Sequence, residues 1–328
     1  MILLYRIQVL AVSLLTAILL NSAAQAKTGN FPDHALTLIL PFPAGGAADG
    51  FARPFAQALG KQLGQTVVVE NLAGANGGIG SAALLNRPAD GYTMLIGSQS
   101  TLAINPSLYA NLGYDPIADF QPVTLTHQMA NVLVVNKQAP FENVKQLVDA
   151  ARKKPGDLSY ASAGNGNTMH LAGEEFQIAT GTRLLHVPYK GGPPALNDVL
   201  AGRVPMMFNN LPAIVPMVKA GRLRAVAIAD SKRSALLLDV PTMKEAGVGD
   251  FTSVVWNGVV VRKGTPTDVL ERLHQAMLKV LKDPAFRQPL EKQGFEVLSS
   301  TPEEFSALLE KDTTSMAALL KKIGMKID

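Results

Sequence analysis

Short apolar runs rich in β-branched residues alternate along the chain with stretches in which apolar side chains recur every three or four residues. Runs of the first kind predict buried strands, and stretches of the second kind predict helices with one apolar face. The expected strands span residues 37–40, 66–69, 92–96, 132–135, 158–161, 184–188, 204–208, 225–229 and 254–261. This alternation is typical of an α/β fold with mainly parallel strands.

Several expected helices carry further signals. Apolar faces are clear over residues 141–151 and 270–280. Thr-Pro pairs followed by acidic residues, at 265–268 and 301–304, predict capping boxes with proline at the first helical position. Pro54 lies inside the first expected helix, which we expect to begin near Asp49. Because its ring removes a hydrogen bond to the Gly50 carbonyl, it predicts a kink.

Residues 1–26 have the pattern of a secretory signal peptide. One cation, Arg6, precedes an apolar run from Val9 to Leu20, and Ala24-Gln25-Ala26 matches the small-x-small cleavage pattern. The run is shorter than the roughly 20 residues that span a bilayer, and no later segment is longer and uncharged. We therefore expect an exported, soluble mature chain that begins at Lys27.

Composition narrows the class of protein. Charged residues make up 17% of the chain and apolar ones 47%, which is typical of a globular protein with a large core, and the length suits two domains. Cysteine is absent, which excludes disulfides, thiolate metal sites, cysteine nucleophiles and a lipid anchor on an N-terminal cysteine. The net charge is only +4, and the cations are scattered, so we expect no nucleic-acid partner.

The most informative segment runs from Leu38 to Arg53, where an apolar strand passes through a Pro/Gly turn straight into a helix start. The first turn of a helix has about four backbone N–H groups without partners and a partial positive charge. A glycine-rich turn that leads into it forms an anion site without Lys or Arg. A second such turn spans residues 162–168. Two such turns in two parts of the chain predict a small anion held between two lobes.

Each residue of these turns has an ordinary structural explanation as well. Asp49 is more easily explained as a helix N-cap than as a ligand contact, because its carboxylate would repel a bound carboxylate. It would help only a ligand that carried an ammonium group. Asn165, Asn167 and Thr168 are either turn residues or ligand contacts. Tyr189 follows a strand and would stack on or hydrogen-bond the ligand, whereas Lys190, beside it, is equally well explained as a surface charge.

Residues 97–101 end the third expected strand and bring hydroxyl and N–H donors to a carboxyl-terminal strand edge, where open α/β sheets bind ligands. All the candidate donors thus converge on one edge. The candidate ligand-binding residues are Phe42, Ala44, Gly45, Gly46, Ala47, Ala48, Asp49, Ser98, Ser100, Thr101, Ser162, Gly164, Asn165, Asn167, Thr168, His170, Tyr189 and Asn209.

Motifs for catalysis are absent from the sequence. There is no G-x-S-x-G, H-E-x-x-H or phosphate-loop motif, and the five histidines show no metal-ligand spacing. The glycine-rich run at 74–80 resembles a dinucleotide loop, but the acidic residue expected about twenty positions later is missing. We therefore expect no catalytic residue, metal or cofactor. A secreted or periplasmic α/β hydrolase using Ser98 or Ser162 stays open as an alternative, although neither serine has an identifiable base.

Seven segments, in order, resemble the solute receptors of tripartite tricarboxylate transporters, often called Bug receptors. They are Pro41–Gly46 with Asp49 and Arg53; Asp90–Leu95; Tyr114–Pro116 with Asp119, Phe120, Pro122 and Val123; His170–Glu174; Val187–Gly191; Asp239–Thr242 with Glu245 and Gly247; and Trp256 with Gly258, Thr265 and Pro266. Each segment alone is weak evidence. Their order along nearly the whole mature chain makes the resemblance specific.

The resemblance implies a two-lobed periplasmic binding protein of the type II-like class, with the ligand cleft between α/β lobes joined by two crossing strands. The crossings would lie near 128–136 and 253–261, with lobe 1 formed by 27–127 and 253–328 and lobe 2 by 128–252. It also implies an organic carboxylate ligand, held by backbone N–H groups, hydroxyls and water instead of an arginine.

The implied function is capture of that ligand by hinge closure in the periplasm and delivery to the integral-membrane subunits of a transporter. We expect the receptor to be a monomer. An orphan receptor that passes its ligand state to a signalling protein is a further alternative. Two departures from the family pattern leave the identity of the ligand open. Asn167 stands where many relatives carry serine, and Asn209 stands where an aspartate is common.

Overall fold

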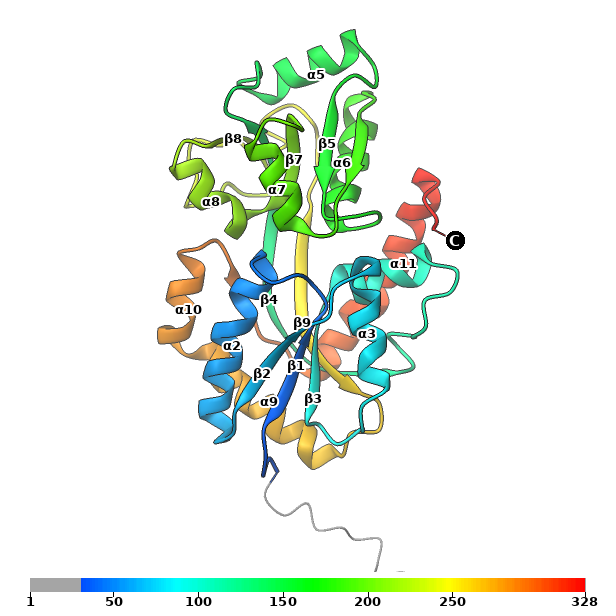
Figure 1. Ribbon diagram of the computed structural model, residues 1–328, viewed down its shortest axis with the longest axis vertical. Helices are drawn as coiled ribbons and strands as arrows, with labels where there is room; N and C mark the ends of the chain where they lie inside the picture. The colour runs from blue at the N-terminus through cyan, green and yellow to red at the C-terminus, as the bar shows by residue number, and fades with distance from the viewer. Residues whose placement is uncertain (1–30, 328) are drawn as a thin grey trace, which may run out of the picture.

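The computed structural model describes residues 31–327, so the signal peptide expected over residues 1–26 lies outside the described part (Figure 1). Its helices are α2 (Ala47–Leu63), α3 (Gly78–Leu85), α4 (Asn105–Leu108), α5 (Val144–Lys153), α6 (Thr168–Thr180), α7 (Gly192–Leu200), α8 (Leu211–Lys219), α9 (Thr267–Lys282), α10 (Pro284–Glu291) and α11 (Pro302–Ile323), with short helical turns η1 (Ala75–Gly77) and η2 (Ser100–Ile104).

The strands form one hydrogen-bonded network in the order β2-β1-β3-β9-β4-β7-β5-β6, with β8 and β10 also paired to β4. They are β1 (Leu36–Leu40), β2 (Val67–Asn71), β3 (Thr93–Ser98), β4 (Phe120–Asn136), β5 (Ser159–Ser162), β6 (Leu185–Pro188), β7 (Met206–Asn210), β8 (Leu223–Ala229), β9 (Val254–Arg262) and β10 (Glu296–Val297). β1 is parallel to β2 and β3, and β5 is parallel to β6 and β7, whereas the pairs that involve β4 or β9 are antiparallel.

Two lobes are visible in Figure 1, with β4 and β9 running between them. β4 pairs with β9 as far as Ala130, and from Asn131 onward it pairs with β7 and β8. One strand therefore belongs to both lobes. The lower lobe contains segments from both ends of the described chain, and the upper lobe contains α5 to α8. The expected two-lobed α/β architecture is confirmed.

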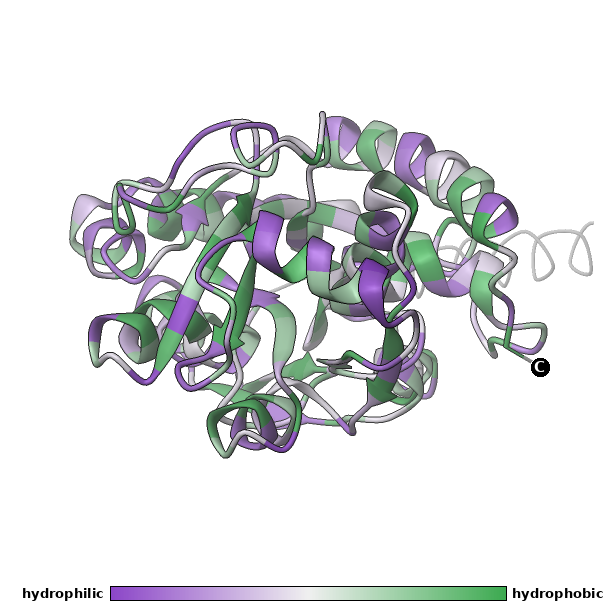
Figure 2. Cartoon of the chain, turned by 90° about the horizontal axis from the view of Figure 1, so that it is seen from above, coloured by the Kyte–Doolittle hydropathy of each residue, from purple (hydrophilic) through white to green (hydrophobic). Residues whose placement is uncertain are grey.

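Each lobe has its own apolar core. In the lower lobe the sheet packs on one face against α2 and α9 and on the other against residues of η2 and α11. In the upper lobe the apolar faces of α5 to α8 cover β4, β7 and β8. Seen from above in Figure 2, the strands are largely hydrophobic, while the surrounding helices alternate hydrophilic and hydrophobic stretches. This amphipathic pattern is what leaves a face of each helix in water.

The start of α2 differs from the sequence-based expectation. Gly46 is the N-cap and the helix begins at Ala47, so the interpretation of Asp49 as the N-cap was wrong. Asp49 instead lies in the first turn, where its carboxylate accepts a hydrogen bond from the Gly45 N–H at 3.0 Å. The helix runs continuously past Pro54, because its buried face of phenylalanine, alanine and leucine side chains anchors both halves to the sheet.

Of the two expected capping boxes, the one at α11 is confirmed. Thr301 and Glu304 exchange side-chain-to-backbone hydrogen bonds. The one at α9 was wrong: Pro266 is the N-cap, and the Thr265 hydroxyl donates to the Arg262 carbonyl at 2.8 Å. The hydroxyl is therefore used to close the preceding turn. Within residues 31–327, no helix is long and apolar enough to cross a bilayer.

His127, on β4, makes the fold sensitive to acid. Its ring is fully buried and stacks on Phe51 at a centroid distance of 3.8 Å, and burial lowers its pKa to about 3. The unfolded chain binds a proton below about pH 6.5, so stability is lost as the pH falls from there toward 3.

We expect His127→Phe, which preserves the stacking, to abolish this loss. Between about pH 7 and about pH 4.5 the wild type should lose roughly 2 kcal/mol of unfolding free energy more than the variant. Urea titrations of both proteins at the two pH values measure the difference. Equal losses in the two proteins would contradict the assignment to His127.

Candidate functional site

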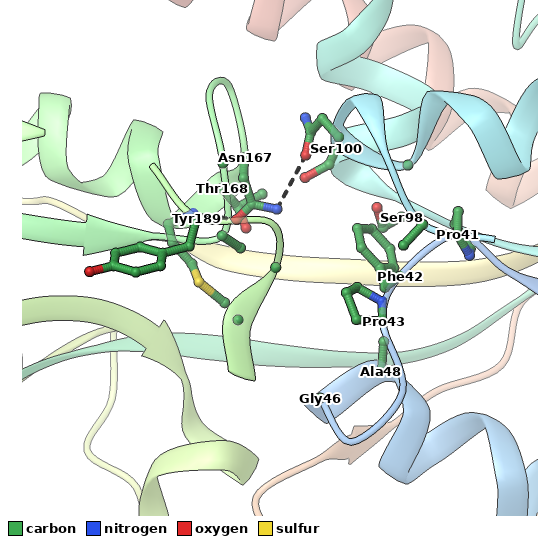
Figure 3. A pocket seen from close by; sticks show the side chains of 18 of the residues that line it. Pro41, Phe42, Pro43, Gly46, Ala48, Ser98, Ser100, Asn167, Thr168 and Tyr189 are labelled. Carbon is green, nitrogen blue, oxygen red and sulfur yellow. Dashed lines mark hydrogen bonds between the residues drawn. The ribbon is translucent and has the colours of Figure 1, made fainter. Parts of the chain in front are cut away.

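A cavity of about 720 Å³ lies between the two lobes. The lower lobe contributes the end of β1 with the start of α2, the end of β3, and the η1 turn. The upper lobe contributes the turns before α6 and α7, and the strands β4, β7 and β9 also supply lining residues. Figure 3 shows Phe42, Gly46 and Ser98 on one side of this space and Asn167 and Tyr189 on the other.

The start of α2 supplies anion-binding character. Gly46, Ala47 and Ala48 line the cavity, and the helix has no side-chain cap at Gly46. The first backbone N–H groups of a long helix are thus left to point toward whatever occupies the cavity. An uncapped helix start is the feature that the sequence predicted for the first glycine turn.

Asp49 does not line the cavity. It is 6% exposed, and its carboxylate accepts hydrogen bonds from Arg53 Nε at 2.9 Å and Asn71 Nδ2 at 3.1 Å. Burial opposes ionisation, but the bonds from Arg53, the Gly45 amide and Asn71 hold the pKa of Asp49 below its usual value. Its charge is neutralised within the lobe, so it adds no acidic group to the cavity wall.

Two hydroxyls at the end of β3 face the cavity. Ser98 and Ser100 line it, whereas Thr101 does not. The Thr101 hydroxyl accepts from the Ser98 N–H at 2.9 Å and donates to the Ser98 carbonyl at 3.1 Å. Thr101 therefore fixes the backbone that presents the two serines. Ser98 has no imidazole partner among residues 31–327.

The second glycine turn is less open than the sequence indicated. Gly164, Asn165, Asn167 and Thr168 line the cavity. However, the Gly164 N–H donates to Ser162 Oγ at 3.1 Å and the Gly166 N–H to His170 Nδ1 at 3.0 Å, while the Asn167 N–H donates to the Gly164 carbonyl. The expectation of a bare turn was wrong, because local side chains take up these donors.

Two donors of that turn stay available. Within the described chain, no acceptor is recorded for the N–H groups of Asn165 and Thr168, and the Thr168 hydroxyl adds a third polar group. Thr168 is the first residue of α6, and Asn167 caps that helix by accepting from the Met169 N–H at 3.0 Å. The helix start is thus ordered before any ligand arrives.

Asn76 bridges the cavity from lobe to lobe. Its Nδ2 donates to the Gly166 carbonyl at 3.2 Å, and its Oδ1 accepts from Asn167 Nδ2 at 3.3 Å. The dashed line from Asn167 in Figure 3 marks the second of these bonds. Its backbone is left-handed, with φ at 50°, a conformation that asparagine tolerates better than most residues. These contacts hold the lobes together in the structure.

Sequence analysis missed this third turn. Gly74, Ala75, Asn76 and Gly77 all line the cavity ahead of α3. The signal was present as the glycine-rich run at 74–80, which was tested only as a dinucleotide loop. The same criterion used for the other two turns, a glycine-rich turn leading into a helix, identifies it.

The opposite wall contains Tyr189 and Lys190. The Tyr189 hydroxyl donates to Asp198 at 2.7 Å and is therefore engaged away from the cavity. Desolvation and this hydrogen bond raise its pKa to about 12. Lys190 is exposed at the edge of the cavity. Asn209 also lines the cavity and is 2% exposed, and its Oδ1 accepts from the Asn210 N–H at 2.8 Å.

The structure thus places most of the candidate residues around one cavity. Those that line it are Phe42, Gly45, Gly46, Ala47, Ala48, Ser98, Ser100, Gly164, Asn165, Asn167, Thr168, Tyr189 and Asn209. Those outside its lining are Ala44, Asp49, Thr101, Ser162 and His170. Ser162 lies 2.6 Å from His186 Nε2, but it is fully buried, so this serine–histidine pair does not meet the cavity. No cluster able to hold a metal occurs within residues 31–327.

Two hinged α/β lobes around a cavity lined by backbone and hydroxyl donors define the class of cleft-closing solute-binding proteins. The family model described as the tripartite tricarboxylate transporter family receptor matches residues 51–325, and the chain belongs to this family. It is therefore a solute-binding receptor and not an enzyme, so the hydrolase alternative was wrong.

Named relatives agree with this assignment. BugT of Bordetella pertussis is 34% identical over 306 residues, which cover 93% of this chain and 94% of BugT. The structure of the periplasmic binding protein BugD is 34% identical, with a TM-score of 0.86 over 90% of this chain and 99% of that one. Rpa4515 of R. palustris, solved with adipate, is 34% identical, with a TM-score of 0.87 over the same shares.

Proposed function

We propose that this receptor captures a small organic carboxylate in the cavity between its lobes and delivers it to the membrane subunits of a tripartite tricarboxylate-type transporter. The observation that carries the proposal is the uncapped start of α2, whose residues Gly46, Ala47 and Ala48 line the cavity. A helix start with free N–H groups favours an anion. The adipate in Rpa4515 supports a carboxylate as that anion.

The cavity lining also bears on the chemistry of the ligand. Among residues 31–327, its cationic lining side chain is the exposed Lys190, and neither Asp49 nor another carboxylate lines it. Neutral amides and hydroxyls, such as Ser98, Ser100 and Thr168, supply the polar groups beside an apolar wall that includes Phe42. This composition favours an anionic ligand with an apolar part and gives an ammonium group no carboxylate partner.

The proposed mechanism is closure about β4 and β9. The carboxylate docks on the start of α2, and donors near Thr168 reach it when the lobes approach. A change from about 1% to about 99% closed requires the closed form to bind about 10⁴-fold better, or about 5.5 kcal/mol. Three or four charge-assisted hydrogen bonds, at about 1.5–3 kcal/mol each, supply that difference.

The boundaries of the two lobes and the cellular location of the protein are part of the same proposal. We place lobe 1 at 27–127 and 253–328 and lobe 2 at 128–252, supported by the change of β4 partners between Ala130 and Asn131. A signal peptide over residues 1–26 would export a monomeric receptor to the periplasm, where its relative BugD acts as a periplasmic binding protein.

Thermal unfolding with a ligand panel tests the function. We expect at least one of adipate, succinate, citrate and benzoate to raise the melting temperature in a concentration-dependent way, with no chemical change in the ligand. At 100 times its dissociation constant a ligand adds about 2.7 kcal/mol of stability. Putrescine, a dication of similar size to succinate, serves as the control and should have no effect. Stabilisation by putrescine but by none of the acids would contradict the proposal.

A further inference from the structure

Two histidines lie behind the second glycine turn, outside the cavity lining. His170 projects from the first turn of α6 and His186 from β6. Their rings are stacked almost parallel, with centroids 3.6 Å apart and an interplanar angle of 8°. Each ring contacts the turn through a different atom, so the pair supports the turn from behind.

His170 holds the turn as a hydrogen-bond acceptor. Its Nδ1 receives the Gly166 N–H at 3.0 Å. A ring nitrogen that accepts from an N–H carries a lone pair, so the proton of the neutral ring is on Nε2, which lies 3.6 Å from Glu174 Oε1. In the imidazolium form both nitrogens carry protons. Protonation of His170 therefore removes the acceptor that the Gly166 amide uses.

His186 acts on the same turn through Ser162. Its Nε2 lies 2.6 Å from Ser162 Oγ, and that oxygen accepts from the Gly164 N–H at 3.1 Å. Desolvation and the neighbouring His170 lower the pKa of His186 to about 3. Two imidazolium rings at the observed stacking distance would repel each other, so the stacked arrangement requires at least one neutral ring.

Within residues 31–327, the other titratable groups that meet the pair are Glu174, on the same helix as His170, and Tyr160, on β5. The Tyr160 hydroxyl donates to Glu174 Oε1 at 2.7 Å, and Gln177 Nε2 donates to the same atom at 2.8 Å. Tyr160 also stacks on His186 at 5.0 Å. Glu174 therefore lies on the Nε2 side of the His170 ring, and the Gly166 amide lies on the Nδ1 side.

We propose that His170 is a positioning residue for the ligand-binding turn and that protonation of its ring weakens ligand binding. The neutral pair holds the Gly164 and Gly166 amides, and the turn then presents the free donors of Asn165 and Thr168 to the cavity. Protonation releases the Gly166 amide and loosens the turn. The effect on ligand binding rests on the proposed function, whereas the effect on the turn does not.

The first experiment measures the turn without ligand. Amide hydrogen exchange at Gly166 is compared in the wild type, His170→Asn and His170→Leu. Asparagine places Oδ1 near the position of Nδ1 and accepts a hydrogen bond without titrating. Between neutral pH and a pH low enough to protonate His170, we expect the protection factor at Gly166 to fall about tenfold in the wild type and to stay constant in His170→Asn. His170→Leu should lack the protection at both pH values.

The second experiment measures affinity for whichever acid of the panel stabilises the wild type. A lower pH protonates the ligand to the same extent whichever protein is titrated. His170→Asn therefore serves as the matched control. We expect the wild-type affinity to fall about tenfold more than that of His170→Asn over the same pH range. His274→Asn, on α9, removes a histidine that bonds the Ser300 carbonyl and should behave like the wild type.

The outcomes separate the two proposals. Equal Gly166 protection in the wild type and His170→Leu would overturn the positioning role even if a carboxylate binds. An equal fall in affinity in the wild type and His170→Asn would overturn the pH dependence of binding. The expected exchange pattern, with stabilisation by putrescine and by no acid of the panel, would support His170 as a support of the turn and overturn the carboxylate receptor.

Discussion

Replacing Gly46 with valine is expected to weaken carboxylate binding at least about 100-fold, which corresponds to about 2.7 kcal/mol, while the protein stays folded. Gly46 has extended backbone angles, φ −85° and ψ 174°, which valine adopts readily. A Cβ there would lie 3.7 Å from Pro193, on the opposite lobe, so one carbon fits. The two further methyl groups of valine would occupy the space between the start of α2 and α7, where we place the anion.

Gly50→Ala provides the control for this substitution. Gly50 lies in the same helix, is exposed, and a Cβ there meets no atom within 4 Å. Alanine should stabilise the helix by about 1 kcal/mol and leave affinity unchanged. Isothermal titration calorimetry gives the affinity, and urea unfolding gives the stability. Wild-type affinity in a folded Gly46→Val protein would mean that the ligand does not bind at the start of α2.

Replacing Asn76 with aspartate is expected to weaken carboxylate binding by a similar factor, about 100-fold, which corresponds to about 2.7 kcal/mol. The change removes the donor that bonds the Gly166 carbonyl and adds a negative charge beside the cavity. A carboxylate there faces a carbonyl oxygen and a bound anion, both of which repel it. The cost therefore includes both the lost contact between the lobes and the new repulsion.

Asn76→Gly separates these two contributions. Glycine adopts the left-handed backbone that Asn76 has, with φ at 50°, and removes the side chain without adding charge. We expect it to weaken binding about tenfold, because three neutral side-chain hydrogen bonds are lost, two of them to the opposite lobe. The single tryptophan, Trp256 on β9, provides a fluorescence signal close to the hinge. Equal affinities for Asn76→Asp and Asn76→Gly would contradict a negative ligand near this side chain.

The sequence predicted the central strands well because they are short, apolar and β-branched. It missed most of β4, which extends from Phe120 to Asn136. The part before Val132 contains polar residues such as Thr126 and Gln128, and its pairing with β9 shifts register twice. Both features hide the alternation on which strand prediction depends. The two-residue β10 was missed because its position depends on pairing with β4, not on a pattern of its own.

The sequence predicted the candidate site correctly where residues adjacent in sequence place the backbone N–H donors. The start of α2 is such a motif, because the glycine turn and the helix are adjacent in sequence. His170 and Ser162 were candidate ligand contacts, and the structure shows their side chains bonded to the turn behind the cavity. Which face of a turn meets the ligand depends on packing between β5, β6 and α6, and the sequence alone does not contain that information.

The two crossing strands also determine how the protein moves as a whole. β4 and β9 are hydrogen-bonded neighbours up to Ala130 and Val254, where the lobes separate. Two adjacent, paired crossings leave the lobes a single axis of rotation, whereas a flexible tether would permit many orientations. We therefore expect a single closure angle to describe the difference between the ligand-free and the ligand-bound protein.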